Sequence, residues 1–397
     1  MRVTRILGAL AALGSVAPGA MAQQKVVLDK PSAEYAESFT SISSIRELPG
    51  GKVLVADRFD KIVQLVDLLA GSAIKVGREG SGPGEYALPI ALVPLPDGTT
   101  LVLDPLNRRF LSVSADGKPG AFVDLPRPPS NGPGGPVMMI GGFDVRGVDA
   151  KGRIYFQAAP FGPNGSTLDS VAILRWDRSN ANMDTVAYVK LPAGSASATS
   201  SGGNMRVMIG GGKRFTPAEA WGVAGDGRVA RVLPEPYRVV WVAGPSRMAA
   251  GPVVPYTPMK VTEADKQEFI EAQKKNRPMM ITMGDGGGGG GRVAGGGGGG
   301  NIQAPPPEFA DTKPPFVAGP GGGGSVLVAP EGEVWVLRTR PAGDKIPTYD
   351  VFDRTGTLVK KVSLNPSSRV IGFGKGSVYV VRTDEDDLQY LQRYARP

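Results

Sequence analysis

One short pattern recurs six times along this chain of 397 residues and limits its fold more than any other feature. In each copy, a glycine is followed at once by a run of apolar residues. A glycine in this setting suits a tight hairpin turn, because such turns need a positive φ. Runs such as residues 53–56 and 334–337 are apolar on both faces, as in a strand between two layers. The six glycines are Gly51, Gly98, Gly152, Gly227, Gly332 and Gly376.

Further strands are predicted on both sides of each run. Examples are residues 42–48 and 92–95 before the glycine, and residues 62–67 and 109–114 after the run. Repeated antiparallel sheets of three or four short strands with glycine turns are typical of β-propellers, in which neighbouring sheets bury each other's faces around an axis. We therefore predict an all-β fold, a six-bladed β-propeller formed by residues 23–397.

The fourth and fifth of these glycines are 105 residues apart, which indicates a long insertion in the ring. We place this insertion at residues 257–314. Thr262 and Asp265, three residues later, resemble a capping box, and good helix formers follow them. The sequence therefore predicts a short surface helix over residues 263–275, with acids early and lysines late.

The second half of the insertion is rich in glycine and proline. Thirteen glycines lie within residues 284–300, and three consecutive prolines follow at residues 305–307. This composition buries too little apolar surface to offset the loss of chain entropy on ordering. Residues 284–314 are therefore predicted to be a disordered loop.

A cleavable signal peptide is predicted over residues 1–22. Two arginines precede an apolar run at residues 6–17, and the small residues Ala20 and Ala22 mark a cleavage site. The mature chain is then expected to begin at Gln23 and to be secreted or periplasmic. No later segment contains the roughly 18 apolar residues that a membrane helix needs, so no membrane span is expected.

The composition excludes several kinds of chemistry. The chain has no histidine and no cysteine, which rules out Ser-His-Asp and Cys-His nucleophile systems, histidine- or thiolate-bound zinc, and disulfides. Catalysis would have to use carboxylate, Lys, Tyr or Ser groups. The formal net charge of +8 is spread without a block of five Lys or Arg residues. This indicates a solvated surface and no nucleic-acid partner.

A glycine-rich segment at residues 77–86, followed by Pro89, resembles the inter-blade linker of NHL-repeat and related six-bladed propellers. In that linker a glycine-rich turn is followed by an aromatic residue and a proline. The Asp97-Gly98 turn, the strand after it and residues 107–109 also resemble an NHL repeat.

The resemblance implies that the N- and C-terminal segments share one blade, with residues 26–28 as the strand that closes the ring. Relatives of this kind include protein-binding scaffolds, sugar-lactone hydrolases and peptide-amidating lyases. The amidating and streptogramin lyases use histidines, which this chain lacks. The resemblance therefore does not extend to those two activities.

The sixth position after each repeated glycine falls at the end of a strand and supplies four charged candidates for ligand binding, Asp57, Asp104, Arg338 and Arg382. Because blade six adjoins blade one in a closed ring, Arg382 and Asp57 are expected to meet on one rim. The functional interpretation is a polar ligand site, with arginines holding a carboxylate or phosphate and aspartates holding a hydroxyl or calcium. The structural interpretation, which we favour, is turn residues and an ion pair between blades.

These observations predict an exported, monomeric propeller that acts as a non-enzymatic binding or scaffold module. Its partner would be a protein, a peptide or a small polar ligand on one rim, and no cofactor, metal ligand or catalytic residue is assigned. The alternative is a calcium-dependent hydrolase of the sugar-lactone type, in which carboxylates hold the ion and polarise a carbonyl. That alternative needs three or four Asp, Glu or Asn side chains converging at the axis.

Overall fold

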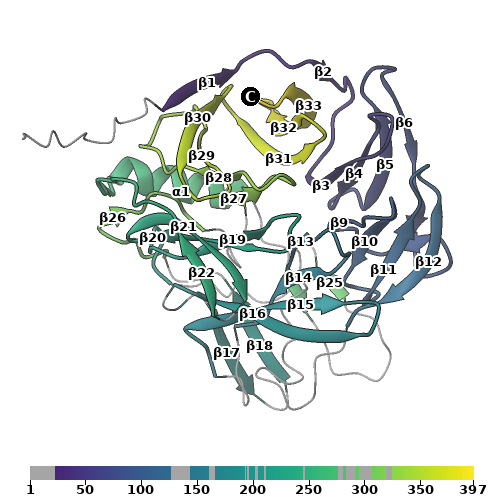
Figure 1. The fold of residues 1–397 in the computed structure, drawn as a ribbon, viewed down its shortest axis with the longest axis horizontal. Helices are drawn as coiled ribbons and strands as arrows, with labels where there is room; N and C mark the ends of the chain where they lie inside the picture. Colours follow the sequence, from purple (N-terminus) through teal and green to yellow (C-terminus); the bar gives the residue numbers. More distant parts are fainter. Residues whose placement is uncertain are drawn as a thin grey trace, which may run out of the picture.

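The computed structural model describes residues 23–126, 144–160, 166–192, 194, 196–201, 204–209, 212–244, 246–275, 280–282, 292–294, 306–318 and 324–397. The predicted signal peptide and most of the predicted disordered loop lie outside these residues. Six sheets surround a common axis, as Figure 1 shows, which confirms the six-bladed β-propeller. Innermost strands of neighbouring blades contact one another around this axis.

The first three blades each contain four antiparallel strands, which follow one another from the axis outward. Blade one consists of β3 (Ile42–Glu47), β4 (Val53–Asp57), β5 (Ile62–Asp67) and β6 (Ser72–Lys75). Blade two consists of β9 (Ala91–Pro94), β10 (Thr100–Asp104), β11 (Arg109–Val113) and β12 (Pro119–Asp124). Blade three consists of β13 (Asp144–Val148), β14 (Ile154–Gln157), β15 (Ser170–Asp177) and β16 (Asn182–Lys190).

The other three blades follow the same plan. Blade four consists of β19 (Ala220–Val223), β20 (Val229–Pro234), β21 (Tyr237–Gly244) and β22 (Arg247–Ala250). Blade five consists of β27 (Val326–Val328), β28 (Val334–Leu337), β29 (Thr348–Phe352) and β30 (Leu358–Leu364). Blade six begins with β31 (Ser368–Gly374), β32 (Ser377–Thr383) and β33 (Gln389–Ala395).

Two features of the repeat explain why the blades form. All six repeated glycines have a positive φ, between 67° and 94°, in the turn before the second strand of their blade. The second strands are buried on both faces, as the pattern predicts, and their side chains enter six apolar clusters. Each of these clusters joins one pair of neighbouring blades. A blade therefore buries its apolar faces only when the blades on both sides are present.

The N-terminal segment closes the ring, but with different residues from those predicted. Strand β2 (Ala33–Glu34) pairs with β33, so the two ends of the chain share blade six. Residues 26–28 lie instead in β1 (Gln24–Leu28), which runs parallel to β30 as a fifth strand of blade five. Tyr35 and Phe39 fix this arrangement, because both are buried in the cluster between blades six and one.

The insertion follows blade four and contains α1 (Glu263–Lys275), the helix that the sequence predicts. Its capping box is present, since the amide of Thr262 donates to the Asp265 carboxylate at 2.8 Å and the amide of Asp265 donates to Thr262 Oγ1 at 3.3 Å. Among the described residues, no helix is long and apolar enough to cross a membrane.

Part of the predicted disordered loop has defined partners. In the described stretch 306–318, β26 (Thr312–Lys313) pairs with β23 (Met259–Lys260), so the prediction is wrong for residues 306–314. The reason is Phe309, whose ring packs edge-on against Phe269 of α1 at 5.7 Å. Residues 283–291 and 295–305 lie outside the described residues.

Smaller strand pairs complete the described structure. They are β7 (Arg78–Glu79) with β8 (Glu85–Tyr86), β17 (Ala196–Ser201) with β18 (Asn204–Ile209), and β24 (Met280–Thr282) with β25 (Arg292–Ala294).

Candidate functional site

Asp57 and Asp104 occupy equivalent strand ends in blades one and two, where each accepts hydrogen bonds from nearby backbone amides. Both carboxylates are buried, with 2% and 1% of the residue exposed. Asp57 accepts hydrogen bonds from the backbone amides of Ser41, Phe59 and Asp60 at 2.8 to 3.1 Å. Asp104 accepts hydrogen bonds from the backbone amides of Ala87 and Leu88 and from the Asn107 side chain at 2.7 to 3.1 Å. Both carboxylates therefore accept hydrogen bonds around the ends of their own strands.

Arg382 forms its ion pair with Glu34 of β2, at 2.9 Å, and not with Asp57. Its guanidinium also lies 4.4 Å from the centre of the Tyr390 ring. The closing strand supplies this partner, because Glu34 pairs with Gln392 on the outer edge of the same blade. Arg382 therefore helps to attach the N-terminal segment to blade six.

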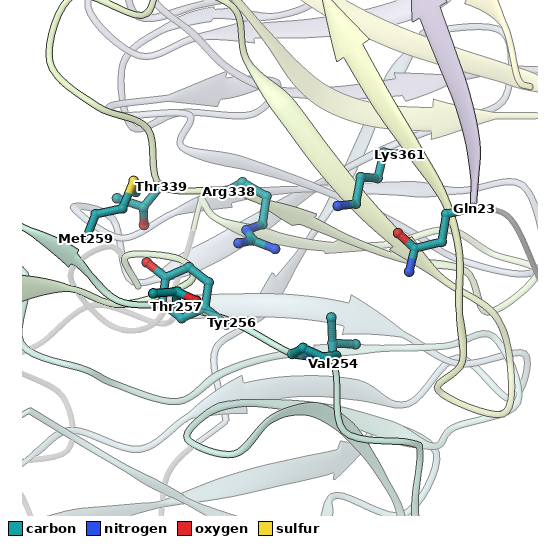
Figure 2. Close-up of a pocket in the computed structure, with 9 residues that line it drawn as sticks. Gln23, Val254, Tyr256, Thr257, Met259, Arg338, Thr339 and Lys361 are labelled. Atoms are coloured by element: carbon teal, nitrogen blue, oxygen red, sulfur yellow. The ribbon is translucent and has the colours of Figure 1, made fainter. Parts of the chain in front are cut away.

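Arg338 differs from the other three candidates because it lies in the wall of a cavity of about 490 Å³. Figure 2 shows its side chain near the centre of this cavity, with Lys361 and Gln23 on one side and Met259 and Thr339 on the other. A volume of this size lies in the range of small-molecule sites. We call this space the Arg338 cavity.

Three separate parts of the chain build the Arg338 cavity. Blade five contributes Arg338, Thr339 and Lys361, and Gln23 precedes the added strand β1. The segment that leads from blade four into the insertion contributes Val254, Pro255, Tyr256, Thr257 and Met259. The cavity thus lies where blade five meets the base of the insertion.

A buried carboxylate and two aromatic rings hold Arg338 in place. Nη1 of Arg338 lies 2.5 Å from Oδ2 of Asp350, a residue with 0% exposure. The same oxygen accepts a hydrogen bond from the Tyr237 hydroxyl at 3.0 Å. The guanidinium lies 5.2 Å from the centre of the Tyr237 ring and 5.0 Å from that of Tyr256, within the range of cation–π attraction.

The protonation states of this group follow from its burial and its charges. Burial acts to lower the pKa of Arg338, but the charge of Asp350, its hydrogen bond and the neighbouring Tyr237 and Tyr256 together outweigh this effect, and the pKa is raised. Burial, followed by the charge of Asp350, raises the pKa of Tyr237 well above its ordinary value. Around neutral pH, Arg338 therefore stays a cation and Tyr237 stays a hydrogen-bond donor.

Strand register places a second cation on the same face of blade five. Asp350 lies opposite Val336 on one side and opposite Lys361 on the other, and directly opposed residues project from the same face of a sheet. Arg338, two residues after Val336, belongs to this face as well. Within the described part of the chain, the half-buried Lys361 ammonium makes no ion pair or side-chain hydrogen bond.

Two polar atoms of the lining are buried without a partner among the described residues. They are Nε of Arg338 and Oγ1 of Thr339. Most buried polar atoms in folded proteins are hydrogen-bonded, and each exception calls for a local explanation. Both atoms are shielded from solvent, so a molecule in the cavity does not reach them.

Carboxylates do not form a cluster that could hold a metal ion among the described residues. In the described ranges, no three Asp or Glu side chains lie close enough together to hold a metal ion. Asp57 and Asp104, the carboxylates proposed for calcium, are already engaged by backbone amides.

Sequence reasoning found Arg338 but missed Asp350, Lys361 and Tyr256. The signal for Asp350 was present, since an acid stands in the middle of the otherwise apolar strand β29. A buried acid in such a strand needs a cation nearby. No comparable signal marks Lys361 or Tyr256, because their roles depend on strand register and on the path of the insertion.

No family model matches this chain, and no curated protein matches its sequence. Among solved structures, similar folds occur in regucalcin, a calcium-binding protein from Agrobacterium tumefaciens (11% identity, 92% of this chain and 95% of that chain, TM-score 0.41). A gluconolactonase from Xanthomonas campestris gives 10% identity, coverage of 94% and 95%, and a TM-score of 0.40. Virginiamycin B lyase from Staphylococcus aureus gives 11% identity, coverage of 91% and 98%, and a TM-score of 0.39.

These likenesses concern the fold alone, and no residue role is transferred from them. The finer prediction of an NHL-repeat propeller stays a prediction.

Proposed function

We propose that this protein is an exported, non-enzymatic binding propeller that holds a small anionic ligand in the Arg338 cavity. The observation that carries the proposal is the pair of cations, Arg338 and Lys361, in a cavity whose described lining residues include no carboxylate, while Asp350 pairs with Arg338. Export rests on the signal peptide predicted for residues 1–22.

The lining supplies the groups that recognise a carboxylate or a phosphate. Arginine and lysine form charge-assisted hydrogen bonds with such anions, and these are about twice as strong as neutral ones. Tyr237, Tyr256 and Asp350 hold the guanidinium in place, so little side-chain entropy remains to be lost on binding. Thr257 adds a hydroxyl group to the same wall.

The test compares one substitution in the lining with a matched control. Lys361→Met removes the unpaired cation, whereas Lys75→Met removes an exposed lysine of β6 in blade one that does not line the cavity. Thermal unfolding is measured with increasing acetate or phosphate, and chloride keeps the ionic strength constant. Arg338 is left intact because its loss would leave Asp350 buried without a cation.

We expect at least one of the two anions to raise the Tm of the wild type and of Lys75→Met. In Lys361→Met, the affinity should fall about tenfold, or by about 1.4 kcal/mol. An equal response of all three proteins, or no response in the wild type, contradicts the proposal.

The alternative from the sequence, a calcium-dependent lactone hydrolase, is tested with the same proteins. A rise of the wild-type Tm with calcium, together with calcium-dependent hydrolysis of glucono-1,5-lactone, would overturn the non-enzymatic proposal.

A further inference from the structure

Resting on the proposed function, we infer that the ligand of the Arg338 cavity is an amphipathic monocarboxylate. Its single carboxylate would lie between Arg338 and Lys361, and its apolar body would lie against Val254, Pro255 and Met259. Three independent features of the cavity lead to this class of compound, namely its charge, its apolar wall and the way its polar groups are already used.

The charge of the site matches a single negative charge. Of the residues that line the cavity, Arg338 and Lys361 contribute two positive charges, and Asp350 offsets one of them. Lys25, which lies opposite Lys361 on β1, is exposed and does not line the cavity. A monoanion therefore neutralises the site, whereas a phosphate dianion would add an excess negative charge near Asp350. Oδ1 of Asp350 is buried without a hydrogen-bond donor among the described residues. Its negative charge is therefore poorly compensated and repels a second negative charge placed beside it.

The apolar part of the lining comes from one segment of the chain. Val254, Pro255 and Met259 belong to the segment that enters the insertion, whereas both cations belong to blade five. Figure 2 shows Lys361 above and to the right of Arg338, Val254 below it and Met259 to its left. The cavity thus has a charged end and an apolar side, which inorganic phosphate cannot use and a hydrocarbon or aromatic group can.

Tyr256 adds to the contrast between the charged and apolar parts of the cavity, because its hydroxyl already has a hydrogen-bond partner. The hydroxyl donates to the backbone oxygen of Lys313 at 2.8 Å, so the residue offers the cavity its ring rather than a polar group. The ring lies 5.0 Å from the guanidinium of Arg338, at the boundary between the charged and apolar parts. A ligand that carries a carboxylate on an apolar body fits both sides of this boundary.

The test uses calorimetric titration at constant ionic strength with three compounds. These are 4-phenylbutyrate, the uncharged 4-phenylbutanol with the same apolar body, and inorganic phosphate. We expect the wild type to bind phenylbutyrate at least tenfold more tightly than either of the other two. Lys361→Met should remove most of the preference for the acid over the alcohol, and Lys75→Met should retain it.

A second variant tests the apolar wall on its own. Met259→Gln keeps the length of the side chain and adds a polar group, so phenylbutyrate should bind several-fold more weakly while phosphate binding stays unchanged. Tighter binding of phosphate than of phenylbutyrate overturns the inference but leaves the proposed anion site intact. Failure of both anions to bind overturns the inference and the proposed function together.

The same chemistry occurs in a free carboxylic acid and in the C-terminus of a peptide with an apolar last residue. Titration with the tripeptide Ala-Ala-Leu and with its C-terminal amide distinguishes these sources. Binding of the free peptide at least as tight as that of phenylbutyrate, with loss on amidation, supports a peptide C-terminus. Binding of phenylbutyrate alone supports a free acid, and binding of the amide as tightly as the free peptide counts against the inference.

Discussion

Asp57 and Asp104 illustrate how one position in the repeat stabilises the blades. Each stands at the end of a second strand, and its buried carboxylate accepts amides from the turn that follows and from the segment that enters the blade. A backbone amide left without a partner in such a place costs free energy, so a short acidic side chain suits the position. In blade five the equivalent residue is Arg338, which faces a cavity instead.

We expect Asp104→Ala to lower the free energy of unfolding by about 2 to 3 kcal/mol, because it leaves several buried donors without an acceptor. The measurement is urea unfolding, with Asp116→Ala as the control. Asp116 is exposed, and its ion pair with Lys118 lies in solvent, so its loss should change the stability little. If Asp104→Ala unfolds like the wild type but loses the binding of anions, the structural role assigned to Asp104 is wrong.

At the level of single residues, the sequence predicts which positions are charged but not what they contact. Arg338, Arg382 and both aspartates were found from their place in the repeat. The partner of Arg382 was missed because Glu34 lies near the opposite end of the chain. Lys361 was missed because only the pairing of β29 with β30 brings it beside Asp350.

Among the larger elements, α1 is joined to the propeller by a buried ion pair. Asp265 and Lys313 are 5% and 3% exposed, and Lys313 Nζ donates both to Oδ1 of Asp265 and to the backbone oxygen of Arg340. Oδ1 of Asp265 also accepts the amide of Ala342 at 2.8 Å. The pair therefore ties the helix start and β26 to the loop that follows Arg338.

We predict that Lys313→Met destabilises this junction by about 3 kcal/mol, because it leaves the Asp265 carboxylate buried without its cation. Amide hydrogen exchange in α1 reports this loss even when the blades stay folded. Lys266→Met is the control, since the exposed pair of Lys266 with Glu263 should contribute less than about 0.5 kcal/mol. Equal exchange in the two variants would show that the ion pair does not hold the helix.

The same pair gives the junction a defined dependence on pH. Burial acts to raise the pKa of Asp265, but hydrogen bonds from Lys313 and Thr262 outweigh it and lower the pKa from 3.8 to about 2. The folded state therefore binds this proton less readily than the unfolded state. The stabilising contribution is complete above about pH 4 and is lost as the pH falls towards 2. In Asp265→Asn, exchange in α1 should depend less on pH across this interval.

Local signals determined how well each element was predicted. The capping box and the helix formers after it sufficed for α1, whose bounds agree with the prediction. The end of the insertion was predicted wrongly because the average composition of residues 284–314 hides Phe309 and Lys313. These two residues have their partners in α1 and its cap.

For the whole molecule, closure of the ring produces both the fold and the candidate site. The number of blades was predictable because each copy of the repeat needs an apolar neighbour on both sides. The Arg338 cavity was not, because its walls come from Gln23, residues 254–259, Arg338 with Thr339, and Lys361. No local pattern relates segments that only the closed ring brings together.

A crystal structure of the protein with 4-phenylbutyrate tests this account most directly. We predict density for the carboxylate within hydrogen-bonding distance of Arg338 and Lys361, and for the phenyl ring against Val254 and Met259. The same crystals of Lys361→Met should show weaker density or none. Well-defined ligand density elsewhere on the propeller, with the Arg338 cavity holding only solvent, would contradict the account.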